Sequence, residues 1–247
     1  MIITPVKTKI LKGKSRSLIK FIDKNIDHLS DKSVVAITSK VVAILEGRLI
    51  PINDSMNKDE IVKQEADYYL PKIEKYNLRL TIKDNVLIPS AGVDESNAFG
   101  NYILWPGNPY KSAREVRTYL AKKLKLKNVG VIITDSKTSP LRWGTTGVSI
   151  GHSGFHALND YIGTADLFGR ELKYTQANIV DGLAAAAVLV MGEGAEQTPL
   201  TICEDIENIK FSTGSPTKTE RAHFNISLKE DLYYSILSKA GWKKKIT

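Results

Sequence analysis

The chain contains a run of β-branched and small residues, Asn128-Val129-Gly130-Val131-Ile132-Ile133-Thr134, which is followed directly by Asp135 and Ser136. A short apolar run that is rich in valine and isoleucine predicts a strand buried inside a sheet. A second run of the same kind, Ser33-Val34-Val35-Ala36-Ile37-Thr38, predicts another buried strand. The shorter segments 85–89 and 174–179 are further strand candidates.

Helical patterns lie between these strands. Residues 57–76 are predicted to form a helix, and Ser112-Ala113-Arg114-Glu115 has the form of a capping box that starts a helix running to about Leu126. Residues 181–191 include four consecutive alanines, which are strong helix formers, and Gly192 follows as the expected C-terminal stop. Because strands and helices do not alternate strictly, we expect an α+β fold rather than an α/β fold.

The C-terminal part differs from the rest in composition. Residues 212–219 are Ser-Thr-Gly-Ser-Pro-Thr-Lys-Thr, which is typical of a flexible loop, and a helical segment is expected over about 228–242. We therefore expect one main domain over residues 1–211, followed by a C-terminal loop and helical segment over residues 212–247.

The composition is that of a soluble globular protein, because 42% of the 247 residues are hydrophobic and 25% are charged. No apolar run is long enough to span a membrane, and the first residues lack the pattern of a signal peptide, so a cytoplasmic location without a membrane partner is expected. The single cysteine, Cys203, lies in an apolar stretch. A buried structural thiol is favoured there over a nucleophile.

The net charge is +8 at pH 7, which would attract an anionic partner. That partner is either a phosphorylated small molecule or a nucleic acid. The basic runs 122–127 and 243–245 contain no interleaved aromatic residues, and no nucleic-acid-binding motif is present. We therefore do not expect a nucleic-acid partner.

Two polar segments follow predicted strands and carry candidate metal ligands. Asp135 comes at the end of a buried strand, where a sheet can hold a carboxylate rigidly, and Ser136 adds a hydroxyl group. The segment Ala91-Gly92-Val93-Asp94-Glu95-Ser96-Asn97 offers a glycine, two acids and an amide. Hard cations that bridge phosphates prefer such oxygen ligands. The alternative for both segments is a polar turn.

Two arginines and one loop are candidates for binding an anionic substrate. Arg142 and Arg170 are candidate clamps, because a guanidinium group matches the geometry of phosphate and carboxylate; a surface ion pair is the alternative for each. The loop after the alanine-rich segment either wraps a nucleotide or merely ends the helix, and it lacks the Lys-Ser/Thr pair of a Walker loop. It consists of Met191, Gly192, Glu193, Gly194, Ala195, Glu196, Gln197 and Thr198.

Taken together and in this order, five segments between about Val6 and Glu204 resemble the F420-0:γ-glutamyl ligase family. They are Thr38-Ser39-Lys40-Val41-Val42 with Glu46-Gly47-Arg48, then 91–97, 130–136, Asp166-Leu167-Phe168-Gly169-Arg170-Glu171-Leu172, and 181–192. The resemblance implies an α+β fold with mixed sheets and intertwined subdomains, and a homodimer.

The resemblance also implies a reaction. GTP phosphorylates a carboxylate of the acceptor, F420-0, and the amine of L-glutamate attacks the acyl phosphate to give a γ-glutamyl amide; Mn²⁺ or Mg²⁺ is required. Phosphoryl transfer needs the charge on the phosphate oxygens neutralised, and metals held by carboxylates achieve this. A folate-type pterin or another small carboxylate is the alternative acceptor. A non-catalytic nucleotide- or ligand-binding protein on the same fold is the alternative from a different class.

Roles for individual residues follow from the resemblance. Asp94 and Asp135 would hold one metal ion, and Ser136 and Glu193 would hold a second. The nucleotide would contact Ser39, Lys40, Asn97 and the loop from Met191 to Thr198. Arg142 and Arg170 are assigned as catalytic clamps from their chemistry alone.

The chain departs from the family pattern after Lys40. The family usually carries Ser-Lys at the positions that Ala43 and Ile44 occupy here. If residues 39–45 form a helix, positions 40 and 44 lie on one face, so that two lysines there would grip one phosphate chain. Ile44 therefore removes a charge from the expected phosphate site.

Overall fold

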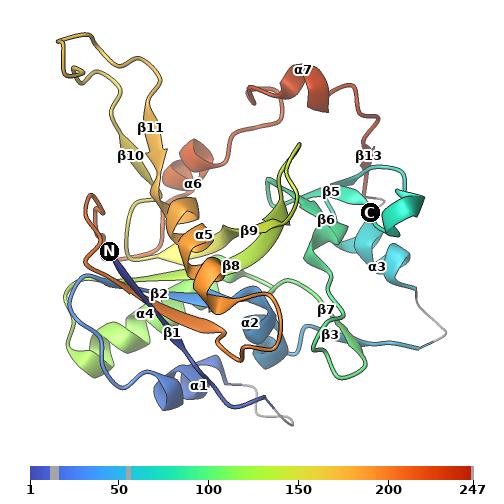
Figure 1. Ribbon diagram of the computed structural model, residues 1–247, viewed down its shortest axis with the longest axis horizontal. Helices are drawn as coiled ribbons and strands as arrows, with labels where there is room; N and C mark the ends of the chain where they lie inside the picture. The colour runs from blue at the N-terminus through green and yellow to red at the C-terminus, as the bar shows by residue number, and fades with distance from the viewer. Residues whose placement is uncertain (12–16, 54–56, 246–247) are drawn as a thin grey trace.

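The computed structural model describes residues 1–11, 17–53 and 57–245. Its centre is a five-stranded sheet in the order β1-β12-β2-β8-β9 (Figure 1). Within this sheet β2 and β8 run parallel, and the other neighbouring strands are antiparallel. The strands are β1 (Ile2–Val6), β12 (Leu200–Glu204), β2 (Ser33–Thr38), β8 (Val129–Thr138) and β9 (Thr145–Ser153).

The sheet is covered on both faces, because successive side chains of its central strands enter different cores. Val35 and Ile37 of β2 pack into the core beneath three helices, whereas Val34 and Ala36 pack into the core beneath α5 (Ile179–Met191). The three helices are α1 (Leu18–Asn25), α2 (Ser39–Glu46) and α4 (Pro109–Leu124). This explains why β2 and the first half of β8, residues 129–133, are apolar or small at nearly every position.

A smaller sheet lies beside the central one and has its own core. Its strand order is β13-β4-β5-β6, and α3 (Lys58–Glu65) packs nearby (Figure 1). The strands are β4 (Tyr68–Tyr69), β5 (Leu80–Lys83), β6 (Val86–Pro89) and β13 (Lys243–Lys244), with a 3₁₀ turn η1 (Glu74–Tyr76) before β5. A second 3₁₀ turn, η2 (Ser90–Gly92), leads from β6 towards Asp94. The mixture of separate sheets and helices confirms the predicted α+β class.

Two further two-stranded units complete the fold. β3 (Leu49–Pro51) pairs with β7 (Asn101–Ile103), and β10 (Leu158–Asp160) pairs with β11 (Gln176–Asn178). The segment between β10 and β11 projects from the sheet as an arm (Figure 1), and its Leu167 and Phe168 are almost fully exposed.

The C-terminal region is less helical than predicted. It contains α6 (Lys218–Phe224) and the single turn α7 (Tyr234–Leu237), not a helix over 228–242. The segment has no continuous buried face that would stabilise a longer helix, because its apolar residues Leu232, Tyr233 and Ile236 are exposed. β13 pairs with β4, so the end of the chain contacts the smaller sheet. The boundary at residue 211 stays a prediction.

Two predicted helix limits are wrong. The helix expected over 57–76 ends at Glu65, and the chain then turns into β4, because Tyr69 fills the smaller core as part of a strand. The capping box at 112–115 does not form either. Helix α4 starts at Pro109 with Asn108 as its N-cap, and the Ser112 hydroxyl instead donates to Glu46 at 2.5 Å.

Other expectations are confirmed. Helix α5 contains the predicted residues 181–191 and stops at Gly192, which has a φ of 77°. Cys203 is fully buried in β12, and burial raises the pKa of its thiol to about 11, as suits a structural residue. Among the described residues, no helix is long and apolar enough to cross a membrane.

Candidate active site

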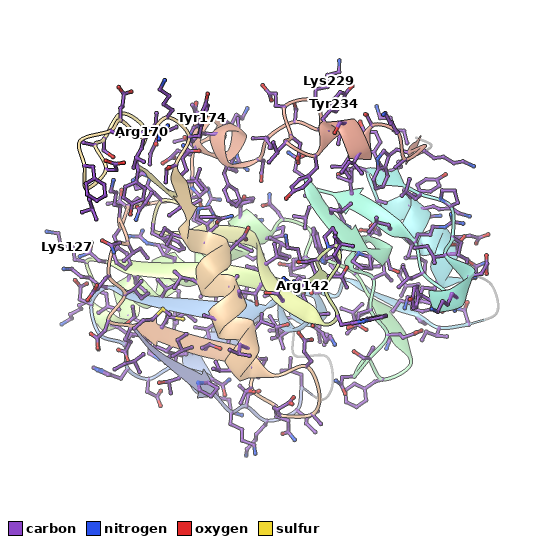
Figure 2. All side chains as sticks on the ribbon, turned by 45° about the horizontal axis from the view of Figure 1, so that its top comes forward. Lys127, Arg142, Arg170, Tyr174, Lys229 and Tyr234 are labelled. Carbon is purple, nitrogen blue, oxygen red and sulfur yellow. The ribbon has the colours of Figure 1, made fainter. Side chains whose placement is uncertain are left out.

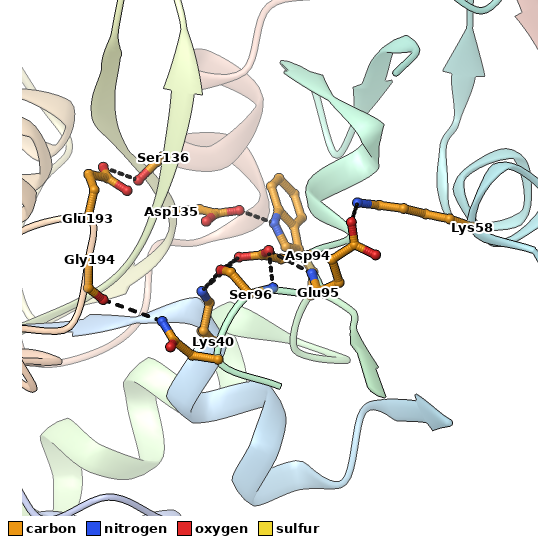
Figure 3. A network of polar contacts seen from close by, with 11 residues as sticks. Lys40, Lys58, Asp94, Glu95, Ser96, Asp135, Ser136, Glu193 and Gly194 are labelled. Carbon is orange, nitrogen blue, oxygen red and sulfur yellow. Dashed lines mark hydrogen bonds and ion pairs between the residues drawn. The ribbon is translucent and has the colours of Figure 1, made fainter. Parts of the chain in front are cut away.

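A cavity of about 700 Å³ opens where the central sheet meets the smaller one. It is bordered by the start of α2, the segment after η2, the middle of β8 and the loop between α5 and β12. Of the predicted site residues, those lining it are Lys40, Asp94, Asn97, Asp135, Ser136 and all of Met191 to Thr198. The structure thus brings together segments that lie far apart in the sequence (Figure 3).

Asp94 is held in place by its own turn and by Lys40. Its carboxylate accepts hydrogen bonds from the backbone amides of Glu95 at 2.6 Å and Ser96 at 2.8 Å, and from the Ser96 hydroxyl at 2.9 Å. The ammonium group of Lys40 lies 2.7 Å from the same carboxylate. Burial would raise the pKa of Asp94, but Lys40 and the Ser96 hydrogen bonds hold it below its ordinary value. Asp94 is therefore anionic at neutral pH.

Among the residues that the structure describes, no cationic side chain forms an ion pair with Asp135. The indole N–H of Trp105 donates to its carboxylate (Figure 3), and Ser39 and the Ser136 amide also bond to it. Burial raises the pKa of Asp135 to about 6, against the effect of these hydrogen bonds, and the negative charge of Asp94 adds to the rise. The two carboxylates thus repel each other across the cavity.

The position of Asp135 in its strand differs from the one expected from the sequence. Asp135 does not follow the strand but lies inside β8, which continues to Thr138. The pairing of β8 with β9 shifts register between Ile133 and Thr134, just before Asp135. Such an irregularity redirects the side chains that follow it. Ser39, also predicted as a site residue, does not line the cavity but supports Asp135 from the first turn of α2.

Trp105 reaches Asp135 because Gly92 leaves room for it. Gly92 has a φ of 70°, and a β-carbon at this position would lie 2.0 Å from the indole nitrogen. A side chain there is excluded both by the backbone conformation and by the indole ring. Gly92 belongs to a segment that the sequence marks as a candidate site, whereas no motif points to Trp105.

A second group of oxygen atoms lies at the loop after α5. The Ser136 hydroxyl donates to the Glu193 carboxylate at 2.7 Å, and Thr145 of β9 donates to the same oxygen at 3.1 Å. The Asn97 amide donates to the Gly194 carbonyl at 3.4 Å (Figure 3). Asn97 and Glu193 thus connect the two sides of the cavity. Thr145 was not predicted.

The donor set suits a hard divalent cation. Carboxylate and hydroxyl oxygens line the cavity, and only Asp94 of the two carboxylates has a cation, Lys40, beside it. A bound cation would offset the burial of Asp135 and its repulsion from Asp94. Residues 1–11, 17–53 and 57–245 contain no cluster of three or more acidic, histidine or cysteine side chains placed to hold a metal ion. Protein ligands would therefore have to be completed by substrate oxygens or water, as is usual for Mg²⁺ sites.

The part of the cavity next to α2, where the resemblance implies a phosphate site, is less basic than the family pattern implies. Ile44 lines the cavity, four residues after Lys40 on the confirmed helix α2. Lys40 itself is committed to Asp94 and to Ser96, whose hydroxyl lies 2.8 Å away. The first turn of α2 has no side-chain cap at Thr38, so its amide groups stay available to an anion.

Arg142 and Arg170 lie away from the cavity. Arg142 is on the turn between β8 and β9, next to the exposed Leu141 and Trp143, and Arg170 is on the arm between β10 and β11 (Figure 2). Neither lines the cavity in the single chain. Their predicted role as clamps stays a prediction.

The comparisons with known proteins show which family the chain resembles in sequence. A model of the F420-0:Gamma-glutamyl ligase family matches residues 5–205. The chain is 37% identical to the coenzyme F420:L-glutamate ligase of Methanococcus maripaludis strain S2 over 202 residues, which cover 76% of this chain and 81% of the relative. It is 36% identical to the enzyme of that name from Methanocaldococcus jannaschii, covering 75% and 80% of the two chains.

A third relative, the coenzyme F420:L-glutamate ligase of Methanopyrus kandleri, is 38% identical over 191 residues, which cover 70% of this chain and 75% of the relative. The matched region contains the candidate site, from the residues before α1 to the end of β12. The chain therefore belongs to the F420-0:γ-glutamyl ligase family.

Proposed function

We propose that this protein is an amide ligase that uses GTP and a divalent metal ion, Mn²⁺ or Mg²⁺, to join L-glutamate to a carboxylate of F420-0. The observation that carries the proposal is that Asp94 and Asp135 both line a cavity of about 700 Å³, with Lys40 beside Asp94. Membership of the family, together with relatives named coenzyme F420:L-glutamate ligase, supports this choice of substrates.

The proposed reaction has two steps. A carboxylate oxygen of the acceptor attacks the γ-phosphorus of GTP, the bond to the β-phosphate oxygen breaks, and GDP leaves. The amine of L-glutamate then attacks the acyl carbon, loses a proton, and displaces inorganic phosphate to form the amide. The acyl phosphate makes the carboxylate reactive by replacing a poor leaving group with a good one.

The metal ions would be held by Asp94 and Asp135, and by Ser136 and Glu193. Bound there, divalent cations neutralise charge on phosphate oxygens. Other groups of the chain position the metal ligand Asp94 and would bind the phosphate. Lys40 fixes the Asp94 carboxylate, and the uncapped first turn of α2 presents amide groups to a phosphate.

The loop between α5 and β12 would enclose the nucleotide. Its C-terminal end is tied to the segment before α1, because the Gln197 carbonyl accepts from the Thr8 amide at 2.8 Å. Its two ends are joined to each other, because the Thr198 hydroxyl donates to the Met191 carbonyl at 2.6 Å. A loop fixed in this way holds two substrates in line and keeps bulk water out.

The test is product formation from defined substrates. Purified protein is incubated with F420-0, GTP, L-glutamate and Mn²⁺, and the products are followed by mass spectrometry and by phosphate release. The proposal predicts a glutamylated acceptor, with one phosphate released for each glutamate added. Glutamylation of a folate-type pterin but not of F420-0 would reassign the acceptor. Nucleotide binding without turnover of any acceptor would favour a non-catalytic binding protein.

We also propose that the protein is a homodimer. Each chain exposes large apolar side chains on its two projecting segments, Leu141 and Trp143 after β8 and Phe168 on the arm, and a partner chain would cover them. Light scattering at micromolar concentration should give twice the chain mass of 27.4 kDa. A monomer mass under these conditions would contradict the proposal.

A further inference from the structure

A second, smaller cavity of about 260 Å³ adjoins the main one. Lys9, Ile10 and Leu11 line both cavities, so the two cavities are direct neighbours. Its remaining walls come chiefly from α1 and from Leu45 at the end of α2, two helices in contact with each other (Figure 1). None of the residues so far assigned to metal ions or nucleotide lines it.

The small cavity has a basic rim and an apolar floor. Lys9, Lys20 and Lys24 provide the rim, and the buried side chains of Phe21 and Leu45 provide the floor. Lys20 and Lys24 are four residues apart on α1 and so lie on one face of that helix. Two like charges at this spacing destabilise a helix slightly, and a bound anion would offset that effect.

These positive charges are not compensated within the described chain. The acidic residue of α1, Asp23, points to α4, where its carboxylate accepts from Lys123 at 2.6 Å and from Tyr119. None of the ion pairs formed among residues 1–11, 17–53 and 57–245 involves Lys9, Lys20 or Lys24. The cavity therefore combines a concave shape with unpaired cations, which is the arrangement expected of an anion-binding subsite.

The helix α2 sets the distance between this subsite and the carboxylates. Lys40 lies at the start of α2 next to Asp94, and Leu45 lies five residues later in the wall of the small cavity. Five residues of α-helix span about 7.5 Å. A ligand that reaches both places must carry an anionic group about that far, or farther, from the group that reacts beside Asp94.

We propose that the small cavity, lined by Lys9, Lys20 and Lys24, binds an anionic group, phosphate or carboxylate, of a substrate whose reacting end lies in the main cavity. This inference rests on the proposed function for the identity of the substrate, but not for the existence of the subsite. Either the acceptor or the nucleotide would carry the anionic group that binds there.

The test compares binding to the wild type with binding to Lys20→Ala/Lys24→Ala and to the charge reversal Lys20→Glu/Lys24→Glu. Both lysines are exposed at the helix surface, so the variants are expected to fold. A matched control is Lys122→Glu/Lys127→Glu, which alters the net charge as much as the charge reversal does, at exposed positions outside both cavities. Calorimetry with F420-0, with GTP and with inorganic tripolyphosphate, each in the presence of Mn²⁺, gives the affinities.

Loss of a charged hydrogen-bonding group is expected to weaken binding by roughly tenfold or more. Weaker binding of F420-0 alone would place the acceptor's anion in the subsite, and weaker binding of GTP alone would place the nucleotide's phosphates there. If the wild type binds neither substrate but binds tripolyphosphate more tightly than the alanine variant does, the proposed function fails and the subsite stands. Equal affinities in the wild type and the α1 variants, or equal losses in the control and the charge reversal, would overturn the inference.

Discussion

Replacing Ile44 by lysine should tighten nucleotide binding. The side chain at position 44 lines the main cavity one helical turn after Lys40, and Lys40 is already engaged with Asp94 and Ser96. A lysine at 44 would therefore add an uncommitted cation where the phosphate chain is expected. Its alkyl stem can keep the contacts that the half-buried isoleucine makes, so the fold should tolerate the change.

The size of the effect follows from one new charged contact. A hydrogen bond to a charged group contributes about 1.5–3 kcal/mol, and about 1.4 kcal/mol corresponds to a tenfold change in affinity. We expect Ile44→Lys to bind GTP roughly 10- to 100-fold more tightly than the wild type in the presence of Mn²⁺. The gain should shrink as the salt concentration rises, because ions screen the new charge.

The assay is calorimetric titration of GTP and of ATP into both proteins. Ile52→Lys is the control, since Ile52 is an exposed apolar residue outside the cavity and the substitution changes the net charge by the same amount. If Ile44→Lys folds normally yet binds both nucleotides no better than the wild type and the control, the assignment of this segment to nucleotide binding is wrong.

Three further predictions concern the support of the site and the stability of the fold. Gly92→Ala should lower the free energy of unfolding by at least about 2 kcal/mol and reduce ligase activity, because the new methyl group collides with Trp105; an unchanged melting temperature would contradict this. Glu193→Gln should lower the number of Mn²⁺ ions bound per chain from two to one, measured by titration, while the melting temperature stays the same because the amide oxygen still accepts from Ser136; unchanged stoichiometry would remove Glu193 from the metal ligands. Arg79 holds the pKa of Asp59 at about 2, below its ordinary value of 3.8, so this ion pair stabilises the fold above pH 4 and its contribution is lost as the pH falls towards 2. Asp59→Asn should therefore lower stability at pH 7 by about 1–2 kcal/mol and flatten the fall in melting temperature between pH 4 and pH 2, whereas parallel pH curves for the two proteins would refute the assignment.

The sequence predicted the centre of the fold because local patterns and burial agree there. The run from Ser33 to Thr38 forms β2 with the predicted limits, since it is buried on both faces. Gly192 ends α5 as its position after the alanine-rich segment predicted, because glycine readily adopts the positive φ found at this helix end. The helix predicted over 57–76 was wrong because Tyr69 is needed in a strand of the smaller core, a tertiary demand that local propensity does not reveal.

The sequence pointed to several of the residues that line the cavity but not to their geometry. Asp94 and Asp135 lie in separate segments, and both line one cavity as the family pattern implied. Their different electrostatic states depend on contacts that no motif encodes: Lys40 lies beside Asp94, whereas Trp105 reaches Asp135 across the space left by Gly92. The sequence also gave no sign that Lys40 is occupied by an acidic partner.

The central claim is that Asp94 and Asp135 create a metal-dependent nucleotide site, and Asp135→Asn tests it most directly. The asparagine side chain has the shape of the aspartate side chain, and its amide oxygen can still accept from the Trp105 indole, so the variant should fold. The asparagine lacks the negative charge that would hold the cation. GTP is titrated into the wild type and the variant, with and without Mn²⁺, in a calorimeter. We predict that the wild type binds GTP only with Mn²⁺ and that folded Asp135→Asn loses this metal-dependent binding. Wild-type affinity for GTP with Mn²⁺ in the folded variant would contradict the account.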